Sequence, residues 1–173
     1  MLPIVVYPDP VLLEPTRKVE RIDEEIRHLL KDMTETMYAA DGIGLAANQI
    51  GVPLRFFIAD LSQWEEHEPL KVFINPVITD SHGRQSGEEG CLSFPGIILE
   101  IERDEQVTVE ALDLEGNPFT LTAEGLLSRA IQHECEHLDG EVFLRNVSSL
   151  KRELTKKQIK KRIKAGDWQA AVT

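Results

Sequence analysis

His133, Glu134 and His137 form an HExxH pattern that restricts the possible folds more than any other part of the chain. On an α-helix, residues i and i+4 lie about 40° apart around the axis, so both imidazoles can hold one metal ion. Glu134 lies about 100° from His133, at the edge of the same face, where its carboxylate can reach a water molecule on that ion. The pattern therefore predicts a helix that binds a metal.

This helix is expected to run from about Glu124 to Asp139 and to end at Gly140, a residue type that favours helix C-termini. Leu126 and Ala130 fall within about 60° of His133 on the same helical face. The histidines therefore continue an apolar stripe rather than a solvated surface. We expect the helix to be central, with its metal-binding face directed inward.

A catalytic site of this kind needs a third protein ligand and one open position. Downstream of the motif, the longer peptidase pattern HExxHxxGxxH is matched as far as Gly140, but Phe143 stands where the last histidine should be. Glu153 lies inside a basic segment and is poorly placed to act as a downstream ligand. Neither zinc-peptidase pattern therefore completes its site in this chain.

Upstream, Cys91 offers a thiolate in the segment Glu89-Gly90-Cys91-Leu92-Ser93. One thiolate and two imidazoles suit zinc, and imidazole also suits iron(II) and nickel. The alternative is that Cys91 is a buried core residue, the commoner fate of a lone cysteine. A core position is also expected for Cys135, which lies about 200° around the helix from His133.

The rest of the chain indicates an α+β fold. The clearest further helix covers residues 23–39, with Asp23 as its N-cap, and another begins near Ser149. Strands grouped between helices, without βαβ alternation, favour antiparallel or mixed sheets around the HExxH helix. The runs expected to form strands are 2–6, 54–60, 71–75 and the hairpin 106–113 with 119–122.

Composition excludes several classes of protein. A chain of 173 residues fits one domain. It has no apolar run of about 18 residues, and its first ten residues lack a basic region, so neither a membrane partner nor export is expected. Two cysteines cannot build a disulfide scaffold and are expected to be reduced in the cytoplasm. A net charge of −11 argues against a general nucleic-acid or specific DNA binder.

The charge is segregated along the chain. Residues 145–164 hold nine of the nineteen basic residues and one acidic residue, so this segment carries +8 and the rest of the chain −19. The expected C-terminal helix is imperfectly amphipathic, because one apolar set lies nearly opposite the other. We therefore expect the helix to break or its second half to leave the domain. The two sets are Val147, Leu150 and Leu154, and then Ile159 and Ile163.

Three motifs together resemble those of the peptide deformylase family. Residues 42–49 (GIGLAANQ) are similar to the family's GxGLAAxQ, residues 89–93 to its EGCLS, and residues 132–137 (QHECEH) to its QHExDH. They occur in family order and at about family spacing, and the resemblance spans about residues 2–150. The chain departs from the family at Glu136, where the family usually has aspartate, and this departure concerns an outer contact rather than the ligands.

The resemblance implies a metal-dependent hydrolase that removes the N-formyl group from the first methionine of nascent polypeptides. Cys91, His133 and His137 would bind iron(II), with zinc, nickel or cobalt as possible substitutes. Glu134 would act as general base and then acid, and formate would be released. Gln49 and the Leu92 backbone N–H would stabilise the developing oxyanion. Without the resemblance, Gln49 would be interpreted as a loop-capping amide.

The resemblance also suggests where the substrate binds. Gly44, with Gly42, would let the substrate backbone approach closely, although both glycines could simply permit a tight turn. Leu126, Ala130 and Ile43 are expected to form the methionine pocket, and the alternative is that all three are ordinary core residues. The chain is expected to divide into a catalytic domain, 1–147, and a basic helix and tail, 148–173.

Other interpretations remain open from the sequence. A zinc endopeptidase would share HExxH but lacks its downstream ligand here. A structural metal site would need a fourth protein ligand and no particular residue at 134. The basic segment 145–164 is either a solvated helix face or a surface that orients the enzyme toward ribosomal RNA. His28, His67 and His82 lack ligand spacing and are expected at the surface.

Overall fold

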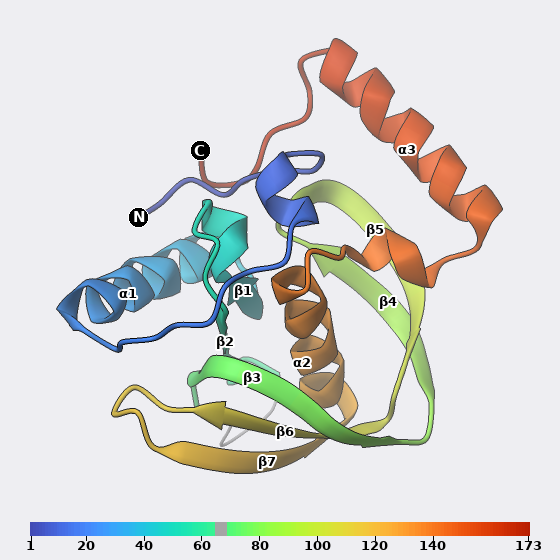
Figure 1. The fold of residues 1–173 in the computed structure, drawn as a ribbon. Helices are drawn as coiled ribbons and strands as arrows, with labels where there is room; N and C mark the ends of the chain where they lie inside the picture. The colour runs from blue at the N-terminus through green and yellow to red at the C-terminus, as the bar shows by residue number, and fades with distance from the viewer. Residues whose placement is uncertain (65–68) are drawn as a thin grey trace.

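The computed structural model describes residues 1–64 and 69–173 and confirms the expected α+β class. Figure 1 shows how its elements are arranged. The α-helices are α1 (Glu24–Ala39), α2 (Gly125–Leu138) and α3 (Ser149–Lys164), and short 3-10 helices cover Pro10–Leu13 (η1), Ala47–Ile50 (η2) and Phe143–Asn146 (η3). The strands are β1 (Gly44–Ala46), β2 (Phe56–Ala59), β3 (Lys71–His82), β4 (Gln85–Cys91), β5 (Phe94–Arg103), β6 (Gln106–Leu112) and β7 (Pro118–Glu124).

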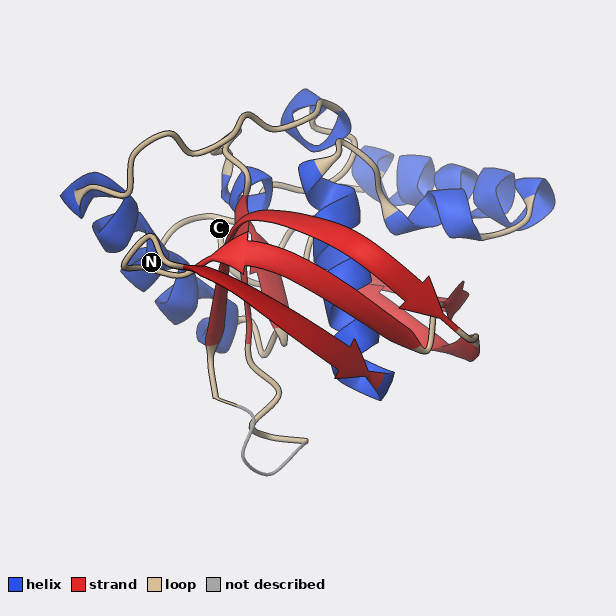
Figure 2. Ribbon diagram, turned by 60° about the horizontal axis from the view of Figure 1, so that its bottom comes forward, coloured by secondary structure: helices blue, strands red, loops and turns tan. Residues whose placement is uncertain are grey.

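The strands form two antiparallel sheets. One has five strands in the order β1-β2-β3-β6-β7, and the other contains β4 and β5. The long strands β3, β6 and β7 curve across one side of α2, while β4 and β5 lie on another side (Figures 1 and 2). The metal-binding helix is therefore central, as its apolar stripe predicted.

Period-2 patterning explains how the large sheet packs on α2. In β6, Val107, Val109 and Ala111 alternate with more exposed residues and enter one core cluster. Ile131 and Leu138 of α2 are fully buried in the same cluster. The hydrophobic effect on these two faces therefore fixes α2 against the sheet.

The helix boundaries predicted from capping signals are confirmed. Asp23 caps α1 by accepting a hydrogen bond from the Ile26 backbone N–H at 3.0 Å. Gly140 follows α2 with a φ of 76°, and a Cβ there would lie 2.6 Å from the Glu14 backbone carbon. Only glycine meets both requirements, so α2 can end while the N-terminal loop packs against it.

Three expectations about strands differ from the structure. Residues 2–6 do not form a strand, because their backbone N–H groups bond to unrelated partners: Ile4 to Val172 O and Val5 to Gln49 O. The predicted strand 71–75 continues to His82 through register shifts after Ile74. Strands β1, β4 and β5 were not predicted at all, and Cys91 is the last residue of β4.

The prediction that the C-terminal helix breaks or leaves the domain is wrong. Helix α3 is continuous, and it packs through the side that carries Thr155 and Ile159, which are 3% and 2% exposed. The opposite set is solvated, since Leu150 and Leu154 are exposed. None of the helices in the described parts of the chain is long and apolar enough to cross a bilayer.

Candidate metal centre

The three predicted metal ligands come together beside the central helix. Cys91 reaches the site from the end of β4, and α2 supplies His133 and His137 one turn apart. Their ligand atoms all lie within 4.8 Å of one another, and Cys91 Sγ is 3.3 Å from His137 Nε2. One residue distant from the HExxH motif, Cys91 at the end of a strand, thus joins the two histidines of the motif in an S, N, N donor set.

The charges around the site fit a bound cation. Burial and the neighbouring His133 lower the pKa of His137 well below its usual value, so its imidazole is neutral and offers a lone pair. Burial also lowers the pKa of His133, but hydrogen bonds to Cys91 and Glu89 outweigh this effect and raise it. Neighbours that favour positive charge on His133 equally favour a metal ion next to it.

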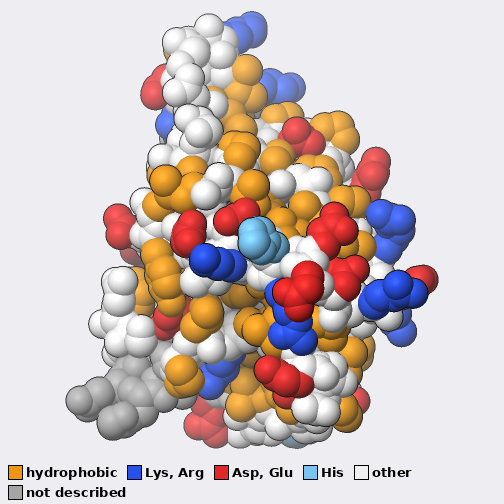
Figure 3. Space-filling model, turned by 90° about the vertical axis from the view of Figure 1, so that its left-hand side faces the viewer, with side chains coloured by type: hydrophobic (Ala, Val, Ile, Leu, Met, Phe, Trp, Pro, Cys, Tyr) orange, Lys and Arg blue, Asp and Glu red, His pale blue; other side chains and the backbone are white. Residues whose placement is uncertain are grey.

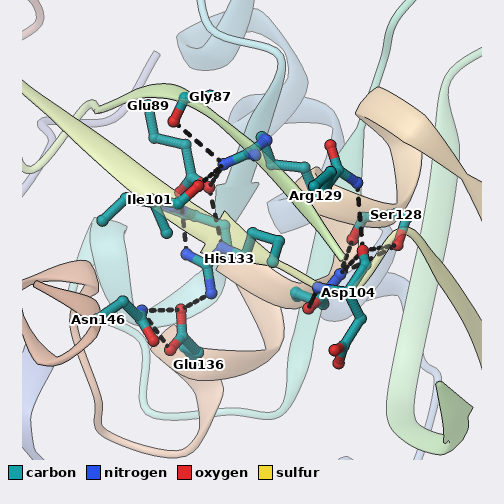
Figure 4. Close-up of polar contacts among 12 residues, drawn as sticks. Gly87, Glu89, Ile101, Asp104, Ser128, Arg129, His133, Glu136 and Asn146 are labelled. Carbon is teal, nitrogen blue, oxygen red and sulfur yellow. Dashed lines mark hydrogen bonds and ion pairs between the residues drawn. The ribbon is translucent and has the colours of Figure 1, made fainter. Parts of the chain in front are cut away.

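Glu89 contacts His133 and accepts hydrogen bonds from two arginines beside the site (Figure 4). Glu89 Oε1 lies 2.8 Å from His133 Nδ1, which leaves Nε2 as the metal-binding atom. Arg103 donates two hydrogen bonds of 2.9 Å to the Glu89 carboxylate, and Arg129 donates another. Burial alone would raise the pKa of Glu89, but its bonds to Arg103 and His133 hold it well below its usual value.

Glu136 completes this network on the outer side of α2. Its carboxylate accepts hydrogen bonds from Arg103 and from Asn146 Nδ2, the latter at 2.9 Å (Figure 4). Arg103 is only 4% exposed, so the carboxylates of Glu89 and Glu136 compensate a buried guanidinium. The longer side chain at position 136 therefore still makes the outer contact that the resemblance left in question.

Glu134 is the glutamate of the HExxH motif, on α2 between the two histidine ligands. It is 3% exposed, and Oε1 accepts no hydrogen bond within the described chain. Burial raises the pKa of Glu134 to about 7, against the opposing effect of His133. A Cβ on Gly44 would lie 2.8 Å from Glu134 Oε2, so glycine at position 44 gives the carboxylate its space.

Gln49 makes the capping contact that its sequence position suggested, and its other amide atom faces Cys91. Its Oε1 accepts a hydrogen bond from the Ala46 N–H at 2.9 Å, which caps η2. Its Nε2 donates to Ser93 Oγ at 3.1 Å and lies 3.7 Å from Cys91 Sγ. The capping oxygen thus fixes the amide so that its N–H donors face Ser93 and one metal ligand, Cys91.

A cavity of about 480 Å³ opens onto this centre. His137 does not line it and lies behind the other ligands, only 1% exposed. Leu92, in the turn between β4 and β5, contributes to the wall together with the predicted pocket residues. The predicted site residues that line the cavity are Ile43, Gly44, Gln49, Cys91, Leu92, Leu126, Ala130, His133 and Glu134.

Several residues that build the site were missed. Glu89 is in a quoted motif, and its place two residues before Cys91 is the only signal that could have pointed to it. Arg103 and Arg129 carry no local pattern, because their partners lie on other elements. Asn48 Nδ2 donates to His137 O at 2.6 Å and so fixes the end of α2.

The remaining cysteine and histidines lie apart from the centre. Cys135 is buried in the core beneath the large sheet, and burial raises the pKa of its thiol to about 12. A metal ligand must be a thiolate, and this pKa keeps Cys135 in the thiol form. His28 and His82 are exposed, as expected. The expectation for His67 lies outside the described residues.

Comparison with known proteins gives one consistent family. The sequence model of the family described as Polypeptide deformylase matches residues 1–153. A peptide deformylase of Acidobacterium capsulatum is 51% identical over 166 residues, which cover 96% of this chain and 98% of that protein. A peptide deformylase of Aquifex aeolicus is 45% identical over 163 residues, which cover 94% of this chain and 96% of that protein.

Solved structures agree with the sequence comparison. A crystal structure of a peptide deformylase from Legionella pneumophila has a TM-score of 0.86 and 42% identity, covering 95% of this chain and 98% of that one. A structure of a peptide deformylase from Synechococcus elongatus in complex with actinonin also has a TM-score of 0.86, with 41% identity, covering 93% of this chain and 87% of that one. The similarity therefore extends over nearly the whole described fold.

Proposed function

Because this chain belongs to the peptide deformylase family, whose members are metal-dependent hydrolases that remove the N-formyl group of nascent polypeptides, we propose roles in that reaction for its own residues. The observation that carries the proposal is the buried Glu134 carboxylate beside a cluster of three ligand residues. No fourth metal-ligating side chain joins this cluster in the described chain. An open position beside a buried base is the arrangement that hydrolysis requires.

Cys91, His133 and His137 would hold the metal, and we propose iron(II) as the ion used, with zinc, nickel or cobalt as possible substitutes. One thiolate and two neutral imidazoles accept all four, so the donor set alone does not select iron. Zinc is favoured over iron by intrinsic affinity, and metal availability during preparation decides which ion is found. When bound, the ion supplies a Lewis acid and lowers the pKa of a water molecule.

Glu134 would transfer the proton. Its carboxylate accepts a proton from the attacking water and then passes it to the departing amine, so that formate and a free N-terminus are released. A pKa near neutrality suits both halves of this transfer. The Gln49 amide and the Leu92 backbone N–H would stabilise negative charge on the formyl oxygen, supported by the position of Gln49 Nε2 beside Cys91.

The formyl-methionine side chain would bind in the apolar part of the cavity. Leu126 and Ala130 lie one or two turns before His133 on α2, and Ile43, just before β1, lines the same cavity. An unbranched thioether fits between such aliphatic walls without an unpaired polar group. Gly44 would let the substrate backbone pass close to Glu134.

The decisive experiment measures formate release from a formyl-Met peptide by iron(II)-loaded protein and by its Glu134→Gln variant, prepared anaerobically. We expect release by the wild type and a loss of at least about 10²-fold in the variant, with equal metal content. Equal rates would mean that Glu134 does not transfer the proton. A site that is only structural would retain metal and release no formate in either protein.

We also propose that the reaction occurs in the cytoplasm, on chains emerging from the ribosome, and that the basic segment 145–164 contacts ribosomal RNA. Five lysines of α3 are exposed and available for such contact: Lys151, Lys157, Lys160, Lys161 and Lys164. Phosphate groups attract a cationic helix of this kind without reading a base sequence.

A further inference from the structure

The last residues of the chain fold back onto the domain after α3. Gly166, with a φ of 70°, ends the helix, and Trp168 and Ala170 that follow are 8% and 9% exposed. Trp168 Nε1 donates to Tyr7 O at 2.6 Å, and Ile4 N donates to Val172 O at 3.0 Å. Figure 1 shows this segment running back beside the N-terminal residues. The segment 165–172 is therefore docked at both of its ends.

The docked segment packs against the start of β5, and the two together are called the wall below. The Trp168 ring packs edge-on against Phe94 at 6.3 Å, and the Arg162 guanidinium lies 4.9 Å from the Trp168 ring centroid. Arg162 also donates a hydrogen bond to Pro95 O. Side chains from α3, the C-terminal segment and β5 thus fix one another.

This wall reaches the substrate cavity. Ala171 is exposed and lines the same cavity as Cys91 and Glu134, together with Phe94 and Pro95 of β5. The metal ligands and Glu134 account for the formyl end of a substrate, and Leu126 with Ala130 for the methionine side chain. Residues at the start of β5 and Ala171 have no role in that assignment. The match to the family model ends at residue 153, so Ala171 lies beyond the part of the chain that this model covers.

We propose that the docked segment 165–172 holds Ala171 at the outer edge of the substrate cavity, and that Ala171 is a specificity-determining residue for the substrate residues that follow formyl-methionine. This inference rests on the proposed function, since it takes the inner cavity as the formyl-methionine site. The methyl group of Ala171 leaves room for a peptide chain, and a larger side chain would narrow the path. The effect belongs to binding and not to chemistry, so KM for longer substrates should change and kcat should not.

The test compares formyl-methioninamide with the tripeptide formyl-Met-Ala-Ser, using full-length iron(II)-loaded protein and its Ala171→Trp variant. We expect the ratio of kcat/KM for the tripeptide to that for the amide to fall about tenfold, through KM. Gln169→Trp is the matched control, because Gln169 is exposed in the same segment but does not line this cavity. It should keep the wild-type ratio. An unchanged ratio in Ala171→Trp would overturn the proposal.

Binding of the product peptide Met-Ala-Ser, measured by calorimetry on metal-loaded protein, tests the wall independently of turnover. We expect about tenfold weaker binding by Ala171→Trp and wild-type affinity for Ala171→Ser. Equal affinities of wild type and Ala171→Trp would contradict the inference. Failure of the wild type to release formate from either substrate would instead contradict the proposed function, so the two failures are distinguishable.

Discussion

The oxygen and the nitrogen of the Gln49 amide make different contacts, so the proposed role of the nitrogen as an oxyanion donor can be tested separately. Gln49→Glu keeps the side-chain length and the acceptor for the Ala46 N–H, but removes the N–H donors that face Ser93 Oγ and Cys91 Sγ. We expect kcat on a formyl-Met peptide to fall by about 10²–10³-fold, the usual effect of losing one oxyanion donor. Metal content should be measured alongside, and a kcat within twofold of wild type at equal metal content would exclude this role.

The effect of replacing Gly44 on activity can be predicted from its distance to Glu134. A Cβ at this position would lie 2.8 Å from Glu134 Oε2, so Gly44→Ala must displace the carboxylate. We expect kcat to fall by about 10²-fold, because a misplaced base loses its near-attack geometry. The three atoms nearest to this Cβ all belong to Glu134, so the iron content, measured by elemental analysis, should stay at the wild-type level. Loss of the metal together with activity would show that Gly44 supports the ligand cluster instead.

At the scale of elements, the N-cap of α1 is a local feature with a predictable energy. Asp23 accepts a hydrogen bond from the Ile26 N–H, and Asp23→Ala leaves that donor to water. We expect a loss of about 1 kcal/mol in the free energy of unfolding, measured by urea denaturation. Lys31→Ala, at an exposed position within the same helix, is the control and should change stability by less than about 0.5 kcal/mol. Equal effects would mean that the cap contributes nothing specific.

Arg103 connects three elements, because it lies on β5 and bonds to Glu89 of β4 and Glu136 of α2. Arg103→Ala leaves Glu89 buried with less compensation, and we expect a loss of about 3–5 kcal/mol at pH 7. Burial alone would raise the pKa of Glu89, but Arg103 and His133 lower it below the ordinary 4.5. The stabilisation is therefore present above about pH 4.5 and is lost as pH falls toward the lowered value.

Urea denaturation of the Arg103→Ala variant at pH 7 and at pH 4 checks both statements. The difference in stability from wild type should be largest at pH 7 and smaller at pH 4, where Glu89 begins to protonate in the unfolded chain. A difference that grows as pH falls would contradict the sign of the Glu89 shift.

The same elements show what the sequence could predict and what it could not. Helices α1 and α2 and the β6–β7 hairpin follow from local signals, namely caps, apolar periodicity and a turn. Strand β4 has two interior glycines and a run of charged residues, and its one buried glutamate is compensated only by residues far along the chain. Local patterns contain no information about such partners, so β4 and the Glu89 network were missed while the motif residues were found.

At the scale of the whole molecule, packing decides which face of α3 is solvated. The apolar pattern predicted that α3 breaks or that its second half leaves the domain, yet the domain buries Ile159 in that half and uses two of the basic residues as structural contacts. Arg152 donates to Leu144 O at 3.0 Å, and Arg162 packs on Trp168. The division into a domain 1–147 and a tail 148–173 remains a prediction, and these contacts attach the second part to the first.

The remaining lysines of α3 form a cationic surface on an acidic protein, and this arrangement predicts salt-dependent ribosome binding. Replacing Lys157, Lys160 and Lys164 by Gln removes three exposed charges and leaves Arg152 and Arg162 in place. We expect weaker sedimentation with ribosomes at low salt and a shallower dependence of the binding constant on salt, because fewer counterions are released. Formate release from a short formyl peptide should not change.

The matched control removes three basic charges elsewhere, from the exposed residues Lys18, Arg21 and Lys31. On the face in Figure 3, which is the left-hand side of Figure 1 where α1 lies, basic and acidic side chains are mixed rather than gathered into a patch of one sign. Both triple variants lower the net charge equally, so an effect of total charge alone would weaken ribosome binding equally. If α3 contacts the ribosome directly, the α3 variant should bind ribosomes more weakly than the control variant. Equal binding by the two variants would exclude that role.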